Sequence, residues 1–276
     1  MMPSLLLAFA TAANQTRHAR RRTSLVTQVK EFSWENCDAL RRDSPRLERS
    51  CVTMSKPNVD LEEILITPQD GDDIFDLIKT SYVDREPLCV GLHLTFEDYL
   101  PLLKNVVPPT LYSNVSFGMR EKSSGKLVAF ILSRILVPQD DPVLFQEGGY
   151  ETKKTNHYTK VLYDLCSDID VLQDGKFKKQ LELQCLSVHP DCSNRGLGRK
   201  LLQMSEEKGK ELGCDVATIQ AVNVVTDSMA KKAGYTTVRT TDIATIKDGT
   251  GRTLLDVDAV RNGLGTSYFT YFMKEL

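Results

Sequence analysis

The chain has 276 residues, of which 35 are Lys or Arg and 37 are Asp or Glu, so its formal net charge is −2. Hydrophobic residues make up 41% and charged residues 26%, values typical of a globular protein. They exclude a coiled coil, a collagen-like chain and a wholly disordered chain, and the near-neutral balance argues against a nucleic-acid partner. The longest apolar run, near Leu5 to Ala13, is far shorter than the roughly 20 residues of a membrane span, so we expect no membrane partner.

The first residues differ in composition from the rest of the chain. Residues 1–30 contain no Asp or Glu and several arginines, which resembles a mitochondrial transit peptide, while the apolar run before small residues also allows a secretory signal. We favour a disordered extension over residues 1–53, because Met54 begins a segment typical of a natural start. We therefore expect one domain over residues 54–276 in a cytoplasmic protein, or a mitochondrial one if the first residues act as a transit peptide.

The cysteines and histidines give no sign of a metal site. The seven cysteines are scattered and no Cys-x-x-Cys pair occurs, which indicates reduced thiols without a disulfide framework or a zinc site. The four histidines have no metal-ligand spacing either. We therefore expect no bound metal.

Apolar periodicity and turn signals predict an α/β chain in which helices and strands are interleaved. In chain order we expect a strand at 62–68, a helix from 70 to before 86, a short helix at 95–103, a break at 106–109, a hairpin of 112–120 with 127–137, a helix around 158–169, a strand at 177–188, a helix at 195–213, a strand at 215–222, a short helix at 227–233 and two strands at 236–246 and 266–273. The alternation slips at Cys185–Leu186, which predicts a β-bulge there.

The most specific feature is a strand that runs through a glycine-containing turn into an amphipathic helix, over residues 186–202. The backbone N–H groups of such a turn and of the helix N-terminus form an anion site. Gly196 and Gly198 let a phosphate approach the backbone closely, and Arg195 and Arg199 add positive charge. The alternative is a plain strand–helix connection. The pattern is neither a Walker loop nor a dinucleotide fingerprint.

This segment resembles the acetyl-CoA-binding motif of the GCN5-related N-acetyltransferases (GNAT), which is Gln/Arg-x-x-Gly-x-Gly/Ala after a Val-x-Pro strand end. Val188-His189-Pro190 and Gly196-Leu197-Gly198 match without a gap, and Asp227–Tyr235 is similar to the family's helix ending in Lys-x-Gly-Phe/Tyr. The likeness covers roughly residues 60–276. It implies the GNAT fold, a mixed central sheet of about six to seven strands flanked by helices (α+β), with acetyl-CoA as co-substrate.

The resemblance also implies which residues hold acetyl-CoA. The N–H groups of the bulged strand would bind the pantetheine and polarise the thioester carbonyl. These residues are Leu186, Ser187, Val188, Ser193, Asn194, Arg195, Gly196, Leu197, Gly198, Arg199 and Asn223. Two positions depart from the family pattern. Ser193 stands where Arg or Gln is usual, so one side-chain contact to phosphate is lost. Arg195 or Arg199 is available to replace that contact. Ala230 stands where the family frequently has a Tyr that acts as general acid.

A second resemblance concerns the acceptor. Asp84–Leu88 is similar to the Asp-Glu-Pro-Leu segment of invertebrate, dopamine-type arylalkylamine N-acetyltransferases, in which the glutamate is the general base. This implies Glu86 as the base, the alternative being a solvated loop carboxylate. Thr226 matches one of two serines that the subfamily has before its last helix, and the other falls on Val222 or Asn223. The implied catalytic residues are therefore Glu86 and Thr226.

The implied reaction is acetyl transfer from acetyl-CoA to the primary amine of a small arylalkylamine by direct attack. Alkylamines are mostly protonated at neutral pH, so a general base is needed. No cysteine nucleophile is required, and we interpret Cys185 and Cys192 as structural. The alternatives are an N-acetyltransferase for polyamines or protein amines, and a non-catalytic CoA-binding module. We favour a monomer.

Aromatic and acidic residues distinguish the possible amines. Six aromatic side chains are available to pack against a substrate ring: Phe96, Tyr99, Tyr268, Phe269, Tyr271 and Phe272. A polyamine needs several carboxylates along a channel, and the only candidate cluster is Asp70, Asp72 and Asp73, which a helix N-terminus also explains. We therefore expect aryl amines rather than polyamines.

Overall fold

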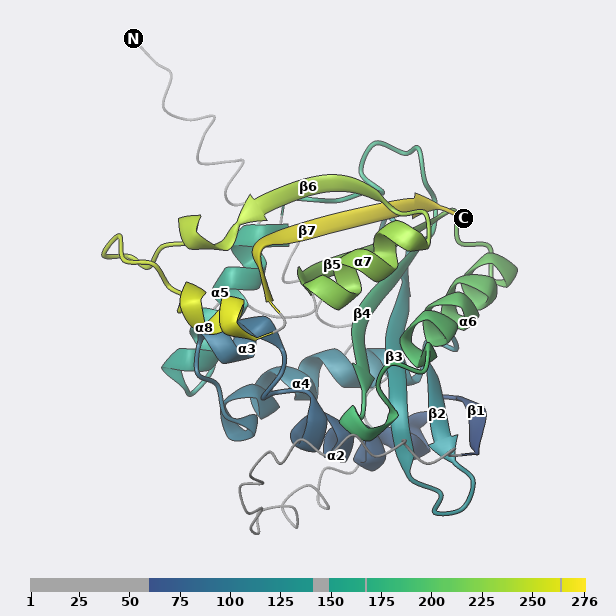
Figure 1. The fold of residues 1–276 in the computed structure, drawn as a ribbon. Helices are drawn as coiled ribbons and strands as arrows, with labels where there is room; N and C mark the ends of the chain where they lie inside the picture. The colour runs from purple at the N-terminus through teal and green to yellow at the C-terminus, as the bar shows by residue number, and fades with distance from the viewer. Residues whose placement is uncertain (1–59, 141–148, 167, 264) are drawn as a thin grey trace. The chain divides into compact units, whose positions relative to one another are not determined.

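The computed structural model describes residues 60–140, 149–166, 168–263 and 265–276 (Figure 1). The extension expected over residues 1–53 and the domain start at Met54 lie outside the described residues. Within the described residues, no helix has the length and apolar content needed to cross a membrane.

A mixed seven-stranded sheet forms the centre of the described fold, in the order β1-β2-β3-β4-β5-β7-β6. The pair β4–β5 is parallel and the five other pairs are antiparallel. In Figure 1, β3 and β4 cross the middle of the sheet, while β6 and β7 lie together far from β1. The strands are β1 Leu61–Leu65, β2 Phe117–Glu121, β3 Leu127–Leu136, β4 Gln180–Val188, β5 Val216–Asn223, β6 Thr236–Asp242 and β7 Gly265–Glu275. The predicted mixed sheet is confirmed.

Helices cover both faces of the sheet. They are α2 Gly71–Ser81, α3 Pro87–Gly91, α4 Phe96–Leu111, α5 Lys153–Cys166, α6 Leu197–Glu211, α7 Val224–Lys232 and α8 Val257–Asn262. The predicted elements are present, with ends shifted by several residues. The predicted end of the helix at Gly213 is confirmed, because this residue follows α6 with a left-handed φ of +78°. The short helix α8 was not predicted, since six residues carry too little apolar periodicity.

The break expected at residues 106–109 was wrong, because α4 continues through Pro101, Pro108 and Pro109. A proline within a helix removes the N–H that would bond the carbonyl four residues earlier. The residues that own those three carbonyls, Glu97, Lys104 and Asn105, are all exposed, so water can satisfy them. Burial of the helix's apolar face then outweighs the lost bonds.

The two faces of β4 have different roles. Leu181 and Leu183 belong to the core beneath α6, together with Leu201 and Leu202. Because strand side chains alternate, Gln180 and Glu182 point to the opposite face of the sheet. The predicted bulge is confirmed one residue earlier than expected. Leu132 pairs with Cys185 while Ser133 pairs with Leu183, so Gln184 is the extra residue.

Candidate active site

The parallel strands β4 and β5 separate near their ends. Their pairing stops at Leu183 and Ile219, although β4 runs on to Val188 and β5 to Asn223. Beyond this point, within the described strands, the β4 backbone groups that face β5 have no strand partner. The bulge lies just where the divergence begins. The sheet therefore contains an opening lined by backbone donors and acceptors that lack a strand partner on the β5 side, which suits an extended chain-like ligand.

A pocket lies at this opening, walled by α2–α5 on one side and by β4, β5, β7 and α7 on the other. Six of the residues that sequence analysis assigned to the site line it: Glu86, Leu186, Ser187, Val188, Asn223 and Thr226. The remaining assigned residues, 193–199, form the turn that precedes α6 and the first residues of that helix. The structure thus brings the expected strand end and the expected base to one cavity.

The turn before α6 has the geometry of an anion site. Asn194 and Gly196 have left-handed φ angles of +65° and +76°, a conformation that asparagine and glycine tolerate. Lys200 N donates to Gly196 O at 3.0 Å, so the N–H groups of the three residues before Lys200 are left without an intrahelical acceptor. Gly196 supplies no side-chain cap to them. These N–H groups are therefore available to a phosphate.

The side chains around the turn offer fewer groups to an anion than its backbone does. Leu197 is buried in the core, so only its N–H can reach a ligand. Arg195 Nη2 donates to Asp191 O at 3.4 Å, Arg199 is exposed, and Ser193 Oγ donates to His189 O at 3.3 Å.

Gly198 lies between the turn and the pocket wall. A Cβ atom there would lie 3.4 Å from Leu186 Cδ2 and 3.7 Å from Met229 Sδ, and both of these residues line the pocket. These are ordinary contact distances, so an alanine fits at this position, whereas a branched side chain would occupy the space between turn and pocket.

Glu86 is a buried carboxylate and not a solvated loop residue. Its residue exposure is 8%, and it caps the N-terminus of α3, where its Oε2 accepts a hydrogen bond from Cys89 N at 2.6 Å. Burial raises the pKa of Glu86, and the hydrogen bonds from the N–H groups of Cys89 and Leu88 oppose that rise. The Glu-Pro sequence places the carboxylate here, because proline at the first helical position leaves the cap to the residue before it.

Three tyrosines lie close enough to this carboxylate for its charge to raise their pKa values, namely Tyr82, Tyr99 and Tyr158, and only Tyr99 was singled out from the sequence. Tyr82 and Tyr99 stack with ring centroids 6.2 Å apart, and Tyr99 meets Tyr158 edge-on at 5.1 Å. The hydroxyls of Tyr99 and Tyr158 are 3.3 Å apart. All three rings line the pocket. Aromatic faces beside a carboxylate form a favourable site for an ammonium group.

Cys185 lies against the same cluster but is unsuited to nucleophilic attack. Burial raises the pKa of its thiol to about 12, a hydrogen bond with Tyr82 opposes the rise, and the charge of Glu86 adds to it. The thiol therefore stays protonated at neutral pH, while the reactive form of cysteine is the thiolate. Cys192 is buried in the core.

Arg85 is a site residue that sequence analysis did not single out. Its Nη1 donates to Val188 O at 3.0 Å and to Ser81 O at 3.4 Å. This bond ties the loop that carries Glu86 to the end of β4, where acetyl-CoA is expected. Partial burial lowers the pKa of Arg85. Only the tertiary structure brings these two segments together, so no local sequence pattern signals the contact.

The expected aromatic slot is half present. Tyr99, Phe269 and Tyr271 line the pocket, whereas Phe96, Tyr268 and Phe272 do not. In β7 this follows from alternation, because residues 269 and 271 face the pocket and Phe272 packs into the opposite core.

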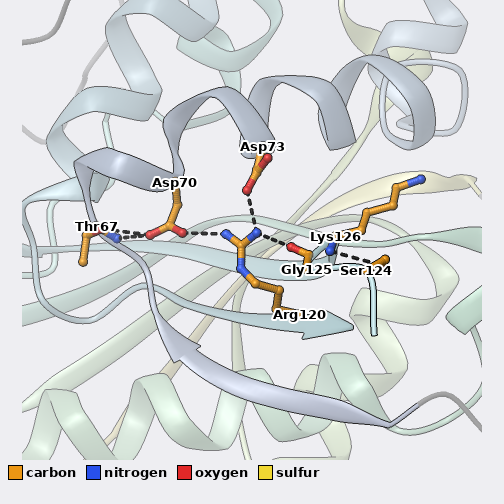
Figure 2. A network of polar contacts seen from close by, with 7 residues as sticks. All are labelled: Thr67, Asp70, Asp73, Arg120, Ser124, Gly125 and Lys126. Carbon is orange, nitrogen blue, oxygen red and sulfur yellow. Dashed lines mark hydrogen bonds and ion pairs between the residues drawn. The ribbon is translucent and has the colours of Figure 1, made fainter. Parts of the chain in front are cut away.

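The acidic cluster considered for polyamines lies away from the pocket. Arg120 bridges two of its members, with Nη2 at 2.7 Å from Asp70 Oδ1 and Nη1 at 2.7 Å from Asp73 Oδ2 (Figure 2). Asp70 also accepts hydrogen bonds from Thr67 N and Oγ1. None of Asp70, Asp72 and Asp73 lines the pocket described above. The cluster fixes the start of α2 and lies outside the pocket.

Two assigned residues lie at the junction of β5 and α7. Asn223 Oδ1 accepts from Thr226 N at 2.7 Å and so caps α7. Both residues also line the pocket. Ala230, at the position where a family tyrosine is frequent, is fully buried in the core.

Comparison with known proteins agrees with this geometry. A model of the acetyltransferase (GNAT) family matches residues 112–235. No curated protein sequence gives a significant match.

Several solved structures share the fold. Arylalkylamine N-acetyltransferase 2 from Aedes aegypti is 19% identical with a TM-score of 0.68, over 78% of this chain and 99% of that one. The polyamine N-acetyltransferase of Drosophila melanogaster is 18% identical with a TM-score of 0.64, over 79% of this chain and 100% of that one. Residues 112–235 thus match the GNAT acetyltransferase family model, and the seven-stranded sheet with its opened parallel pair is the fold that these solved structures share.

Proposed function

We propose that the protein transfers an acetyl group from acetyl-CoA to the primary amine of a small arylalkylamine, with Glu86 as general base. One observation carries the proposal. A buried carboxylate with a raised pKa lies among three tyrosine rings, in a pocket that opens onto the diverging ends of β4 and β5. An arylalkylamine needs a carboxylate for its ammonium and an apolar, aromatic slot for its ring.

The residues at the opening fit acetyl-CoA. The N–H groups at the start of α6 would hold the pyrophosphate, and the left-handed Gly196 keeps the turn free of side-chain bulk. The backbone groups of Leu186–Val188 that face away from β3 would bind the pantetheine and donate to the thioester oxygen as negative charge develops on it. Asn223 lines the opposite strand end.

Glu86 would supply the proton acceptor. The ammonium group loses a proton to the Glu86 carboxylate, and the neutral nitrogen attacks the thioester carbonyl. The carbon–sulfur bond then breaks, and the proton that the acylated nitrogen still carries passes to the departing sulfur, so that the products are the neutral amide and the CoA thiol. A raised pKa suits this step, because it brings the proton affinity of the carboxylate closer to neutral pH. We assign Thr226, on the α7 wall, as a polar contact to the departing sulfur.

A panel of amines tests the proposal. The full chain is mixed with acetyl-CoA and with tyramine, dopamine, serotonin, spermidine or a peptide with a free N-terminus. CoA thiol release and the mass of the acetylated product are measured. We expect kcat/KM for an aryl amine to exceed that for spermidine and for the peptide. A tenfold advantage for spermidine or the peptide would contradict the proposed substrate class, and the absence of turnover with every amine would favour a non-catalytic CoA-binding module.

A further inference from the structure

A polar row crosses the floor of the pocket on the face opposite α6. Arg134 of β3 pairs in register with Glu182 of β4, and Glu182 pairs with Thr218 of β5. Arg134 Nε lies 2.5 Å from Glu182 Oε2, and both side chains are less than a tenth exposed. Gln180 Nε2 donates to Thr218 Oγ1 at 2.7 Å. A buried polar row of this kind is costly unless its members satisfy one another, and these do.

Gln184, the extra residue of the bulge, is the exception. Its Nε2 donates to Glu182 Oε2 at 3.0 Å. Since a carboxylate only accepts hydrogen bonds, this contact fixes the amide orientation and directs Oε1 away from Glu182. Oε1 is inaccessible to solvent and has no hydrogen-bond partner, although the residue as a whole is half-buried and lines the pocket. A shift of this half-buried side chain would bring the unsatisfied acceptor to the pocket surface, where a ligand donor would satisfy it.

The charges at this end of the pocket are already balanced. The Glu182 carboxylate is paired with Arg134. The neighbouring Arg239, whose Nη2 bonds the carbonyl of Leu165, is paired with Asp168 through Nη1 at 2.7 Å. A second cation of a polyamine or a guanidino amine would therefore be buried here without a counter-charge among the described residues, which is unfavourable. A neutral donor such as a phenolic hydroxyl carries no such cost.

We infer that Gln184 Oε1 accepts a hydrogen bond from an uncharged donor at the far end of the acceptor substrate, which selects hydroxylated aryl amines over unsubstituted ones and over dications. The inference rests on the proposed function. Gln184 directly precedes Cys185, which interacts with Glu86, and Glu182 lies about 7 Å further along the strand. A substrate whose amine is at Glu86 would extend its ring toward this end.

The test compares tyramine, phenethylamine and agmatine, which carry a neutral donor, no donor and a cation at the far end. For the wild-type protein we expect kcat/KM for tyramine to exceed that for phenethylamine by about tenfold, the size expected for one buried hydrogen bond. Gln184→Leu should reduce this ratio to within about twofold. Gln184→Glu adds a negative charge and should raise kcat/KM for agmatine relative to kcat/KM for tyramine by about tenfold. Gln220→Leu removes another amide that lines the pocket and should leave both ratios unchanged.

A binding experiment separates this inference from the proposed function. Calorimetric titration of Glu86→Gln with the same amines, in the presence of CoA, measures recognition without turnover. A tyramine preference that Gln184→Leu abolishes in this background supports the inference even if no amine is acetylated. Equal kcat/KM values for tyramine and phenethylamine in the wild-type protein would overturn the inference. A tyramine preference that survives Gln184→Leu would overturn it as well.

Discussion

The two sides of the pocket differ in the chemistry that they present. The proposed cofactor side offers mainly backbone groups, from the turn before α6 and from the end of β4 that does not pair with β5. The acceptor side offers side chains, among them the buried Glu86 and Tyr99 and the half-buried Gln184. Backbone recognition tolerates changes of side chain, so the proposed assignment is compatible with Ser193 at the position where the family usually has arginine or glutamine. Recognition through a few buried side chains is instead sensitive to each of them.

The largest expected effect is on the acceptor side, from Glu86→Gln. The amide preserves the shape of the side chain and can still accept from Cys89 N, but it cannot take a proton. We expect kcat at neutral pH to fall by about 10²-fold or more, with the KM for acetyl-CoA little changed. Steady-state kinetics with the best amine of the panel measures both.

The melting temperature of the same variant is its control. Burial raises the pKa of Glu86, so the folded state binds this proton more tightly than the unfolded state. The stabilising contribution of the group is therefore present at low pH and lost as pH rises through the folded pKa. At neutral pH, Glu86→Gln removes the cost of the buried charge, and its melting temperature should equal or exceed that of the wild-type protein. A large decrease would mean that the kinetic loss reflects unfolding.

Arg134→Met should have the largest effect on stability. It leaves the Glu182 charge buried and unpaired, which we expect to lower the free energy of unfolding by about 3–5 kcal/mol. Lys122→Met, which breaks an exposed pair with Asp60, should cost less than about 1 kcal/mol. Urea denaturation of both variants measures the difference. Equal costs would contradict the view that the acceptor side contains a closed charge pair.

On the cofactor side, the shape of the backbone should matter more than the side chains. Gly198→Val fills the space between the turn, Leu186 and Met229, and should weaken acetyl-CoA binding by about tenfold or more, or about 1.4 kcal/mol. Gly198→Ala adds only a Cβ at ordinary contact distances and is the matched control. Calorimetry with CoA measures both affinities. Normal binding by the valine variant would refute the assignment of this turn to the pyrophosphate.

The smallest expected effect is from Ser193→Arg, which restores the residue type usual in the family. A charge-assisted contact to phosphate should tighten acetyl-CoA binding by a few-fold at low salt, and the gain should shrink as salt is added. Titration at two ionic strengths distinguishes this from a change in packing. Weaker binding by this variant would indicate that Arg195 or Arg199 already occupies the phosphate contact.

The same contrast explains what could be predicted from the sequence. The cofactor turn is one continuous segment, so its glycines, its charges and the following amphipathic helix were all recognisable, as was the slip in alternation that marks the bulge. The acceptor pocket is assembled from α2–α5, β4 and β7, which lie far apart in the chain. Glu86 was found only because a resemblance singled it out.

Other features of the site depend on contacts that no local pattern contains. The pairing of Arg134 with Glu182 follows from the register of β3 on β4. The unsatisfied hydrogen-bond acceptor of Gln184 follows from the place of this residue in the bulge. The prolines of α4 predicted a break because local propensity was the only information available, whereas burial of the helix decides its length.

The most direct test of the central claim is the pH dependence of kcat/KM for the wild-type protein and Glu86→Gln. If Glu86 must be unprotonated to accept the amine proton, the wild-type activity should fall as pH decreases through the pKa of this group. Because burial raises that pKa, the midpoint should lie above the usual range for a glutamate, and the variant should lack this limb of the profile. The same acidic limb in both proteins, or a midpoint at the ordinary glutamate value, would contradict the assignment of Glu86 as the base.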